Sequence, residues 1–448
     1  MNYYNEIDER FAKLLNVGTS FDVIRREVGK EVKVILYFLS SLADSERVNE
    51  LNVSLLLSDS KKYLKEQVSS GAIEVEKDIY KAFLAISSGM SVLLCEDKIY
   101  VVETRNYPSR SVGEPDTEKT IRGSKDGFNE NIIINVGLIR RRIRSEHFKC
   151  EIFKVGDNSN TDVVVTYLDN KVNKKSLKEV IEKIKKTKID GLVMSDRALE
   201  EKIFKQNFNP FPLVRYSERP DVVAAHLLKG HIAIVVDTSS SVIITPTTLF
   251  EHTKHIEEYR QVPSVGTFIR LLRYFAILIS VFLVPLWMLT LNNDSFTSNI
   301  FVKLSNESPI PVLAQIIIVE LVIELLRIAT IHTPNHLSSA MGLIATLILG
   351  QMAVDIGLFQ SEILLYCSIS SIGGFATPSY ELSLANKIVK LLLILVVGLF
   401  GSIGFVIGFT LLIVLLGAIK TYGMPYLYPL IPFDYKEFFK VIFRPSVN

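Results

Sequence analysis

One stretch of the chain places charged side chains inside an apolar run. Residues 310–331 are otherwise hydrophobic, and Gln315, Glu320, Glu324 and Arg327 interrupt them. Glu320 and Glu324 are one helical turn apart and Arg327 follows three residues later, so a helix would carry these charges on one face. Charge at membrane depth requires water or a protein partner. Three interpretations are open: a face that lines an aqueous pathway, a structural ion-pair network, or an amphipathic helix at the membrane interface.

Signs of enzymatic chemistry are weak by comparison. The sequence has no GxSxG, P-loop or HExxH motif. The serines at 239–241 beside Asp237 are typical of a polar hairpin turn, and His252 with His255 lacks a third defined ligand. The three cysteines are far apart, with no CxxC spacing: Cys95, Cys150 and Cys367. We therefore expect no enzyme, no metal site and no cofactor.

Composition divides the chain into two regions. The 448 residues are 48% hydrophobic, yet residues 274–419 contain only eleven charged side chains while the preceding part is rich in charge. The net charge of +2 is too small for a nucleic-acid partner, which would require a dense basic face. These features predict a water-soluble region followed by a helical bundle in the bilayer.

The soluble region shows one order of strands and helices twice. Gly89 and Gly230 each precede two apolar runs joined by a short polar turn, which predicts two similar α/β subdomains at 1–113 and 129–268. Internal duplication would explain the likeness, and so would the pattern of two strands and a polar turn that unrelated β-hairpins share. Expected strands are 32–38, 91–102, 162–168, 191–194, 231–236 and 242–245, and expected helices are 46–57, 79–86 and 174–186.

A polar loop at 114–128 connects the subdomains and is followed by a basic helix predicted at 129–144. Almost no apolar residue occurs in the loop, so we expect an exposed, mobile segment or a contact surface. The basic run on the helix is expected to face solvent or another subunit. Candidate subunit contacts are Arg122, Lys125, Arg140, Arg141 and Arg142.

The membrane region is predicted at 269–419. Residues 274–291 form an uncharged run preceded by Arg270 and Arg273, the pattern of a helix that starts on the cytoplasmic side. Residues 340–359 and 363–380 are further candidate spans.

The last apolar run, residues 391–419, is too long for one upright helix. It would extend about 43 Å at 1.5 Å per residue, against a hydrocarbon core of about 30 Å. It is either tilted or bent, or a hairpin that turns near Gly401 or Gly404. A stripe of small residues indicates close helix packing or a bendable gate: Gly398, Gly401, Gly404 and Gly408.

Topology follows from the flanking charges. The start of the chain lacks a basic segment followed by an apolar run, so we expect no cleaved signal peptide and a cytoplasmic N-terminal region. The basic tail at 420–448 is also expected in the cytoplasm, which requires an even number of spans. We favour four spans, with 310–331 re-entrant or amphipathic and 391–419 crossing once. Six spans are the alternative, which Lys387 and Lys390 support.

Long strings in the sequence resemble a known family. They include DTEKTIRGSKDGF at 116–128, LIRRRIR at 138–144, PFPLVRYSERPDVVAAHLLKGHIAIVVDTSSSVIITP at 210–246, and the later IHTPNHLSSAMGLIATLILGQMAVDIGLF and FATPSYELSLANK. These strings resemble the GerA family of bacterial spore-germination proteins, in particular its A subunits. The resemblance implies a multi-pass protein of the spore inner membrane that acts in germination within an oligomeric ion channel. For receptor-type members it also implies a permease-like B subunit and a lipoprotein C subunit as partners.

The channel interpretation and the charged run meet at one segment. If several chains surrounded an axis, Glu320 and Glu324 would form carboxylate rings that favour monovalent cations. The pore-lining candidates are therefore Glu320, Glu324, Arg327, Gln315 and Asp355. A non-conducting scaffold of a germination complex and a secondary transporter for a small solute are the alternatives, although no inverted repeat supports the transporter.

Overall fold

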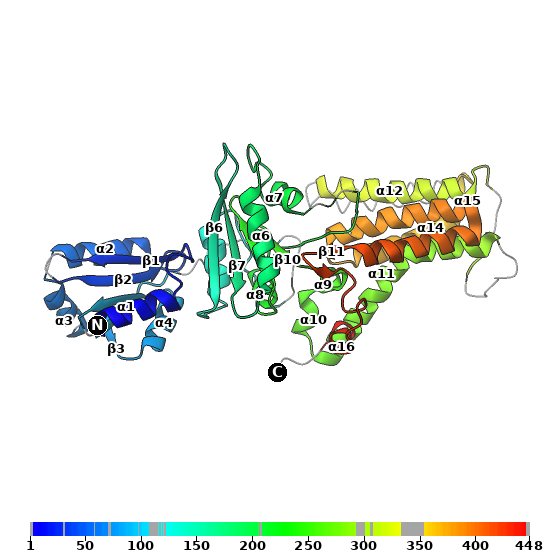
Figure 1. The fold of residues 1–448 in the computed structure, drawn as a ribbon. Helices are drawn as coiled ribbons and strands as arrows, with labels where there is room; N and C mark the ends of the chain where they lie inside the picture. Colours follow the sequence, from blue (N-terminus) through cyan, green and yellow to red (C-terminus); the bar gives the residue numbers. More distant parts are fainter. Residues whose placement is uncertain are drawn as a thin grey trace. The chain divides into compact units, whose positions relative to one another are not determined.

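The computed structural model describes residues 3–29, 32–57, 59–69, 73–96, 98–106, 115, 118, 120, 122–204, 206, 208–292, 301–304, 308–332 and 354–444 (Figure 1). The chain divides into two compact units. The first comprises residues 1–206 and 213–247, and the second comprises residues 207–212 and 248–448.

The first sheet of the first unit is antiparallel and has the strand order β1-β2-β4-β5-β3. Its central strand β2 is buried along its whole length. Alternate residues of β2 pack into two different cores, since helices α1 and α4 cover one face and α2 and α3 cover the other (Figure 1). The bounds are β1 (Val23–Val28), β2 (Val34–Leu39), β3 (Ile73–Glu76), β4 (Ser91–Cys95), β5 (Lys98–Val102), α1 (Tyr3–Leu14), α2 (Ser45–Leu57), α3 (Ser60–Ser69) and α4 (Ile79–Ser87).

The second sheet repeats this arrangement with the order β6-β7-β9-β10-β8, also antiparallel. Gly89 before β4 and Gly230 before β9 both have positive φ, 93° and 92°. A Cβ would lie 2.8 Å from a loop carbonyl at Gly89 and 2.6 Å from one at Gly230, so both positions require glycine. The bounds are β6 (Phe148–Val155), β7 (Thr161–Leu168), β8 (Arg215–Ser217), β9 (Ile232–Val236), β10 (Val242–Thr245), α5 (Ile132–Arg140), α6 (Lys174–Lys186), α7 (Ser195–Ile203) and α8 (Pro220–Leu227).

The α/β character of this region is therefore confirmed, with one error among the expected strands. Residues 191–194 form a loop that leads into α7, and Val193 and Met194 are 91% and 72% exposed. A short apolar run without a neighbouring strand has no partner for its backbone groups, and it remains a loop. Strands β1, β3, β6 and β8 were not expected. Whether the likeness of the two sheets reflects duplication stays a prediction, as do the predicted domain limits.

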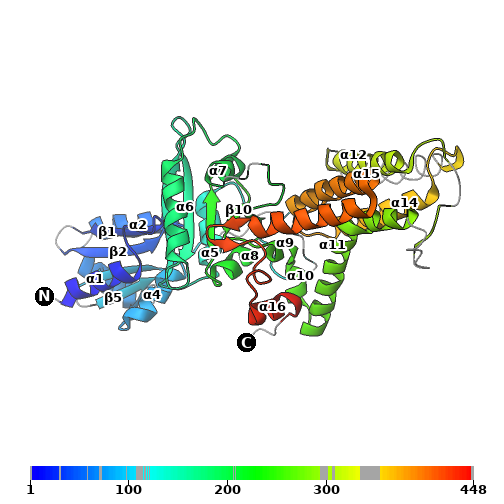
Figure 2. The ribbon, with the colours of Figure 1, turned by 45° about the vertical axis from the view of Figure 1, so that its right-hand side comes forward.

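The second unit is mainly helical, and its long helices pack side by side (Figure 1 and Figure 2). Helix α11 packs against α14 and α15, and α12 packs against the same two helices. Trp287 of α11 stacks on Tyr366 of α14 at 4.4 Å in the core between them. The bounds are α9 (Leu249–Thr253), α10 (Ile256–Arg260), α11 (Pro263–Asn292), α12 (Val312–His332), α14 (Ser361–Phe375), α15 (Tyr380–Ala418), β11 (Lys420–Thr421), β12 (Met424–Pro425) and α16 (Tyr435–Ile442).

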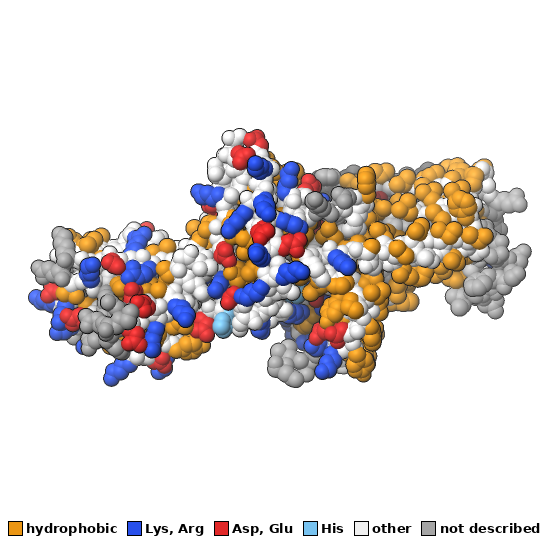
Figure 3. Space-filling view, in the orientation of Figure 1, with side chains coloured by type: hydrophobic (Ala, Val, Ile, Leu, Met, Phe, Trp, Pro, Cys, Tyr) orange, Lys and Arg blue, Asp and Glu red, His pale blue; other side chains and the backbone are white. Residues whose placement is uncertain are grey.

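Apolar side chains cover much of the outer surface of these helices, in contrast to the charged surface of the sheets (Figure 3). Among the described residues, two helices are long and apolar enough to cross a membrane, Pro263–Leu291 and Tyr380–Ala418. The expected span at 363–380 is wrong as one helix, because α14 ends at Phe375 and α15 starts at Tyr380. Most of the expected span at 340–359 lies outside the described residues.

Helix α15 reverses direction at Gly401. This residue has φ 58° and ψ −135°, a backbone conformation that favours glycine. A Cβ on Gly408 would lie 2.7 Å from Leu393 Cδ2, whereas residues 15 apart in a straight helix are separated by about 22 Å. The single crossing that we favoured for 391–419 is therefore wrong, and the segment is a hairpin, as in the six-span alternative. The number of crossings stays a prediction.

Candidate functional site

The charged face of α12 meets two lysines of α15. Glu320 is fully buried. Its Oε2 accepts a hydrogen bond from Lys387 Nζ at 2.5 Å and forms an ion pair with Lys390 Nζ at 2.6 Å. Lys390 is only 2% exposed and also donates to Ser370 Oγ of α14 at 3.1 Å. A carboxylate inside an apolar bundle is thereby compensated by two cations from a neighbouring helix.

Glu324 and Arg327 extend the same network toward the end of α12. Lys387 Nζ lies 3.9 Å from Glu324 Oε2, and Arg327 Nη1 lies 3.7 Å from Glu324 Oε1. Arg327 also donates to Ser383 Oγ at 3.3 Å, and its guanidinium lies 4.8 Å from the ring centre of Tyr380. We call Glu320, Glu324, Arg327, Lys387 and Lys390 the charge cluster. It contains three cationic and two anionic side chains, a local excess of one positive charge.

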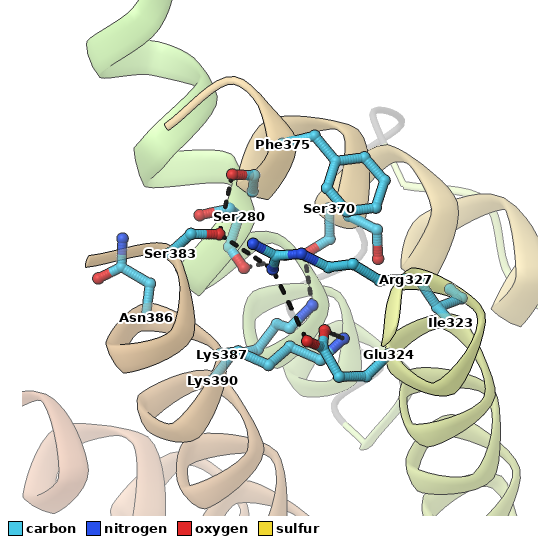
Figure 4. Close-up of a pocket in the computed structure, with 12 residues that line it drawn as sticks. Ser280, Ile323, Glu324, Arg327, Ser370, Phe375, Ser383, Asn386, Lys387 and Lys390 are labelled. Carbon is cyan, nitrogen blue, oxygen red and sulfur yellow. Dashed lines mark hydrogen bonds and ion pairs between the residues drawn. The ribbon is translucent and has the colours of Figure 1, made fainter. Parts of the chain in front are cut away.

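A small cavity of about 20 Å³ adjoins the charge cluster (Figure 4). This space admits roughly one water molecule. Serines 370, 371 and 383 line it together with Asn386, whose Nδ2 is buried without a hydrogen-bond partner in the described part of the chain. Polar side chains of α14 and α15 thus face the charges of α12, and a water molecule or a small ion would find several ligands there.

The remaining predicted pore residues lie elsewhere. Gln315 Nε2 donates to the Ile310 carbonyl at 2.7 Å, and Gln315 Oε1 accepts from the Gln360 amide at 3.0 Å. Gln315 therefore connects the starts of α12 and α14, a structural role. Asp355 is exposed and lies outside the charge cluster.

The glycine stripe of α15 permits close contacts. A Cβ on Gly398 would lie 2.6 Å from Leu313 of α12, and one on Gly404 would lie 2.3 Å from the Val396 carbonyl across the hairpin. Together with the turn at Gly401 and the contact of Gly408, these distances explain the stripe by helix packing. A gating role for the stripe stays a prediction.

The candidate subunit contacts of the first unit fall into two groups. Arg140 is 5% exposed and forms two hydrogen bonds with the buried carboxylate of Asp22, at 2.8 and 2.9 Å. It belongs to the core, so its expected position on a solvent or subunit face is wrong. Helix α5 is also shorter than the predicted 129–144. Arg142 pairs with Asp126 at 2.6 Å. The exposed candidates are Arg122, Lys125 and Arg141, and their role in subunit contact stays a prediction.

Lys387 and Lys390 are the members of the charge cluster that the sequence argument missed. Their spacing of three places them on one helical face ahead of a long apolar run, a signal that we used only to count spans. Nothing in the local sequence indicates that this face contacts Glu320, which precedes Lys387 by 67 residues.

These features define a class: an α/β region joined to a helical unit with two helices able to cross a bilayer, which supports membrane association. The family model of the Bacillus/Clostridium GerA spore germination protein matches residues 9–448. The chain belongs to the GerA family of spore germination proteins, as its sequence resemblance predicted.

Two relatives identified by sequence agree with this assignment. The chain is 44% identical to stage V sporulation protein AF of Bacillus subtilis (strain 168), over 98% of this chain and 92% of that protein. It is 28% identical to spore germination protein KA of the same organism, over 96% of this chain and 82% of that protein. The crystal structure of the N-terminal domain of the A subunit of the Bacillus megaterium spore germinant receptor GerK3 aligns with a TM-score of 0.40 and 25% identity. That alignment covers 54% of this chain and 92% of that chain.

Proposed function

We propose that this chain acts in spore germination as an A-subunit-like protein of the spore inner membrane and contributes to an oligomeric pathway for monovalent cations. Its membership of the GerA family and the names of its relatives support the role in germination. Two helices able to cross a bilayer support the membrane location. Other germination membrane proteins are the proposed partners, including B and C subunits if the chain works as a receptor subunit.

The charge cluster is the observation that carries the ion pathway. Five charged side chains of α12 and α15 converge beside a water-sized cavity within an apolar helical unit. Burial of so many charges is costly for a purely structural element, and it is common where ions or protons pass.

In this proposal the arrangement is a closed state, which the position of the lysines supports. Lys387 and Lys390 form ion pairs with the carboxylate of Glu320, and the net positive charge of the cluster opposes cation binding. Conduction then requires α12 to move relative to α15, so that the carboxylates exchange their lysine partners for hydrated cations. Other copies of the chain would complete the pathway.

Ionic current through the purified full-length chain in planar bilayers tests this proposal. Glu324→Gln should reduce cation current, because Glu324 lines the cavity. Asp355→Asn is the matched control, since it neutralises an exposed carboxylate outside the cluster and should leave the current unchanged. Absence of current from the unaltered chain, alone and with its partners, would contradict the proposal.

A non-conducting scaffold is the second candidate. One observation favours it: in the described part of the chain, each charge of the cluster has an opposite charge within 4 Å, as in a structural network. A scaffold would assemble its partner proteins normally when Glu324 is neutralised, and it would pass no current in any variant.

A further inference from the structure

Helix α16 carries an aromatic stripe that the helical unit leaves exposed. Tyr435, Phe439 and Phe443 follow at intervals of four, so they lie along one side of the helix and its end. Ring centres are 4.8 Å apart in the first pair and 5.5 Å apart in the second. The loop before the helix adds more exposed apolar side chains. The exposed set is Leu430, Ile431, Phe433, Tyr435, Phe439 and Phe443.

This concentration requires an explanation. The exposed fractions of its members run from 43% for Leu430 to 65% for Tyr435. A contiguous apolar patch in contact with water is unfavourable by about 25 cal/mol per Å² relative to burial, and such patches mark interaction surfaces. The opposite side of α16 already has its partner, because Val441 is 5% exposed against the rest of the unit.

Hydrogen bonds hold α16 against α11 at a defined position along the axis of α11. The Tyr274 hydroxyl donates to the Val441 carbonyl at 3.1 Å, and Arg270 Nη1 donates to the carbonyls of Lys440 and Val441 at 2.9 and 3.1 Å. Arg270 is itself 1% exposed and bonded to Glu258. Tyr274 is the first residue of the uncharged run of α11, so α16 lies level with the start of the membrane span.

Basic side chains accompany the aromatic stripe. Lys436 and Lys440 are exposed, one helical turn apart, and adjacent to the stripe on the same half of the helix. Lys440 also pairs with Glu437 at 2.6 Å, but both side chains are about half exposed, and such pairs are weak. In Figure 3, hydrophobic and basic side chains occur together where Figure 1 places α16. Aromatic residues beside lysines at the start of a span are the pattern of a membrane interface.

We propose that α16 and the preceding residues 430–433 form an interfacial anchor, which inserts its aromatic stripe into the headgroup region of a bilayer that contains anionic lipid. The lysines lie toward the lipid phosphates, and their attraction depends on negative lipid charge. The anchor holds the cytoplasmic end of α11 through the carbonyls of α16. This inference rests on the membrane crossing of α11 and is independent of ion conduction.

Site-specific fluorescence in nanodiscs tests the proposal with the full-length chain. The native cysteines Cys95, Cys150 and Cys367 are buried, so Phe439→Cys can be labelled selectively with an environment-sensitive dye. Leu278→Cys, exposed on α11 within the apolar run, reports the hydrocarbon core. Leu57→Cys, 81% exposed on α2 in the first unit, reports water.

Quenching is read with a shallow nitroxide lipid for position 439 and with a lipid whose nitroxide lies deep in the acyl chain for position 278, and position 57 is measured with both. At a depth of about 5 to 10 Å, the label at 439 should lose on the order of half of its emission, and the label at 57 should lose little. Quenching at 439 should be weaker in purely zwitterionic nanodiscs, and Lys436→Gln with Lys440→Gln should remove this dependence on lipid charge.

Two results would overturn the inference. If position 278 is quenched while position 439 behaves like position 57, α16 lies in water. If position 278 is not quenched either, α11 does not cross the bilayer and the anchor has no membrane to bind. Quenching at 439 that is unaffected by lipid charge would refute the role of the lysines.

Discussion

Replacing Glu320 by glutamine tests the pairing inside the charge cluster. The substitution keeps the side-chain shape but removes the only carboxylate within 4 Å of Lys390 in the described part of the chain, leaving it the Ser370 hydroxyl. Breaking one side of a buried ion pair costs about 3 to 5 kcal/mol. Glu324→Gln should cost less than about 1 kcal/mol, because the partners of Glu324 are 3.7 and 3.9 Å away and its side chain is 19% exposed.

Thermal unfolding of the full chain in detergent or nanodiscs measures this difference. For a unit of this size, about 2 to 4 °C per kcal/mol predicts that Glu320→Gln lowers the Tm by roughly 6 to 20 °C. Adding Lys390→Met should restore part of the loss, since it removes the buried cation that Glu320→Gln leaves without a carboxylate. Equal Tm values for the two glutamine variants, or a double variant less stable than Glu320→Gln, would refute the reasoning.

Three further substitutions probe other parts of the structure. Gly401→Ala should destabilise the α15 hairpin by about 1 to 3 kcal/mol, measured as a lower Tm, because alanine strongly disfavours the observed φ and ψ. Asp22→Asn should lower the free energy of unfolding of the first unit by about 3 to 5 kcal/mol, followed by circular dichroism, since Arg140 would lose its buried partner. For Asp8, burial opposes ionisation, but the hydrogen bonds from Arg25 and Tyr37 and the positive charge of Arg25 together outweigh it, so the pKa of this carboxyl is lower than usual. The contribution of ionised Asp8 to the free energy of unfolding is therefore full above the unfolded-state pKa and is lost as pH falls through the folded-state pKa. Asp8→Asn should accordingly weaken the acid-induced loss of stability below about pH 4.

Local patterns predicted the elements whose environment follows from their own residues. The apolar strand at 34–39 and the amphipathic helix at 174–186 were expected nearly as they occur, because a short continuous apolar run and a helical periodicity record which faces are buried. The strands that escaped prediction, β1, β3, β6 and β8, are the edge strands of the two sheets. Strand β8, for example, has only three residues, and it is a strand because its backbone pairs with β10, which its own sequence does not indicate.

The sequence by itself determined the two-part organisation, the family and the presence of charges on one face of 310–331. These properties depend on composition and on spacings of two to four residues, which are independent of how distant elements meet. The tertiary structure alone decided that Lys387 and Lys390 neutralise Glu320, that Arg140 is buried on Asp22, and that α15 turns at Gly401. The first two outcomes depend on contacts between segments far apart in the chain, about which local periodicity carries no information. The third selects one of the alternatives that the sequence left open, a bent helix or a hairpin, through the contact between the two arms of α15.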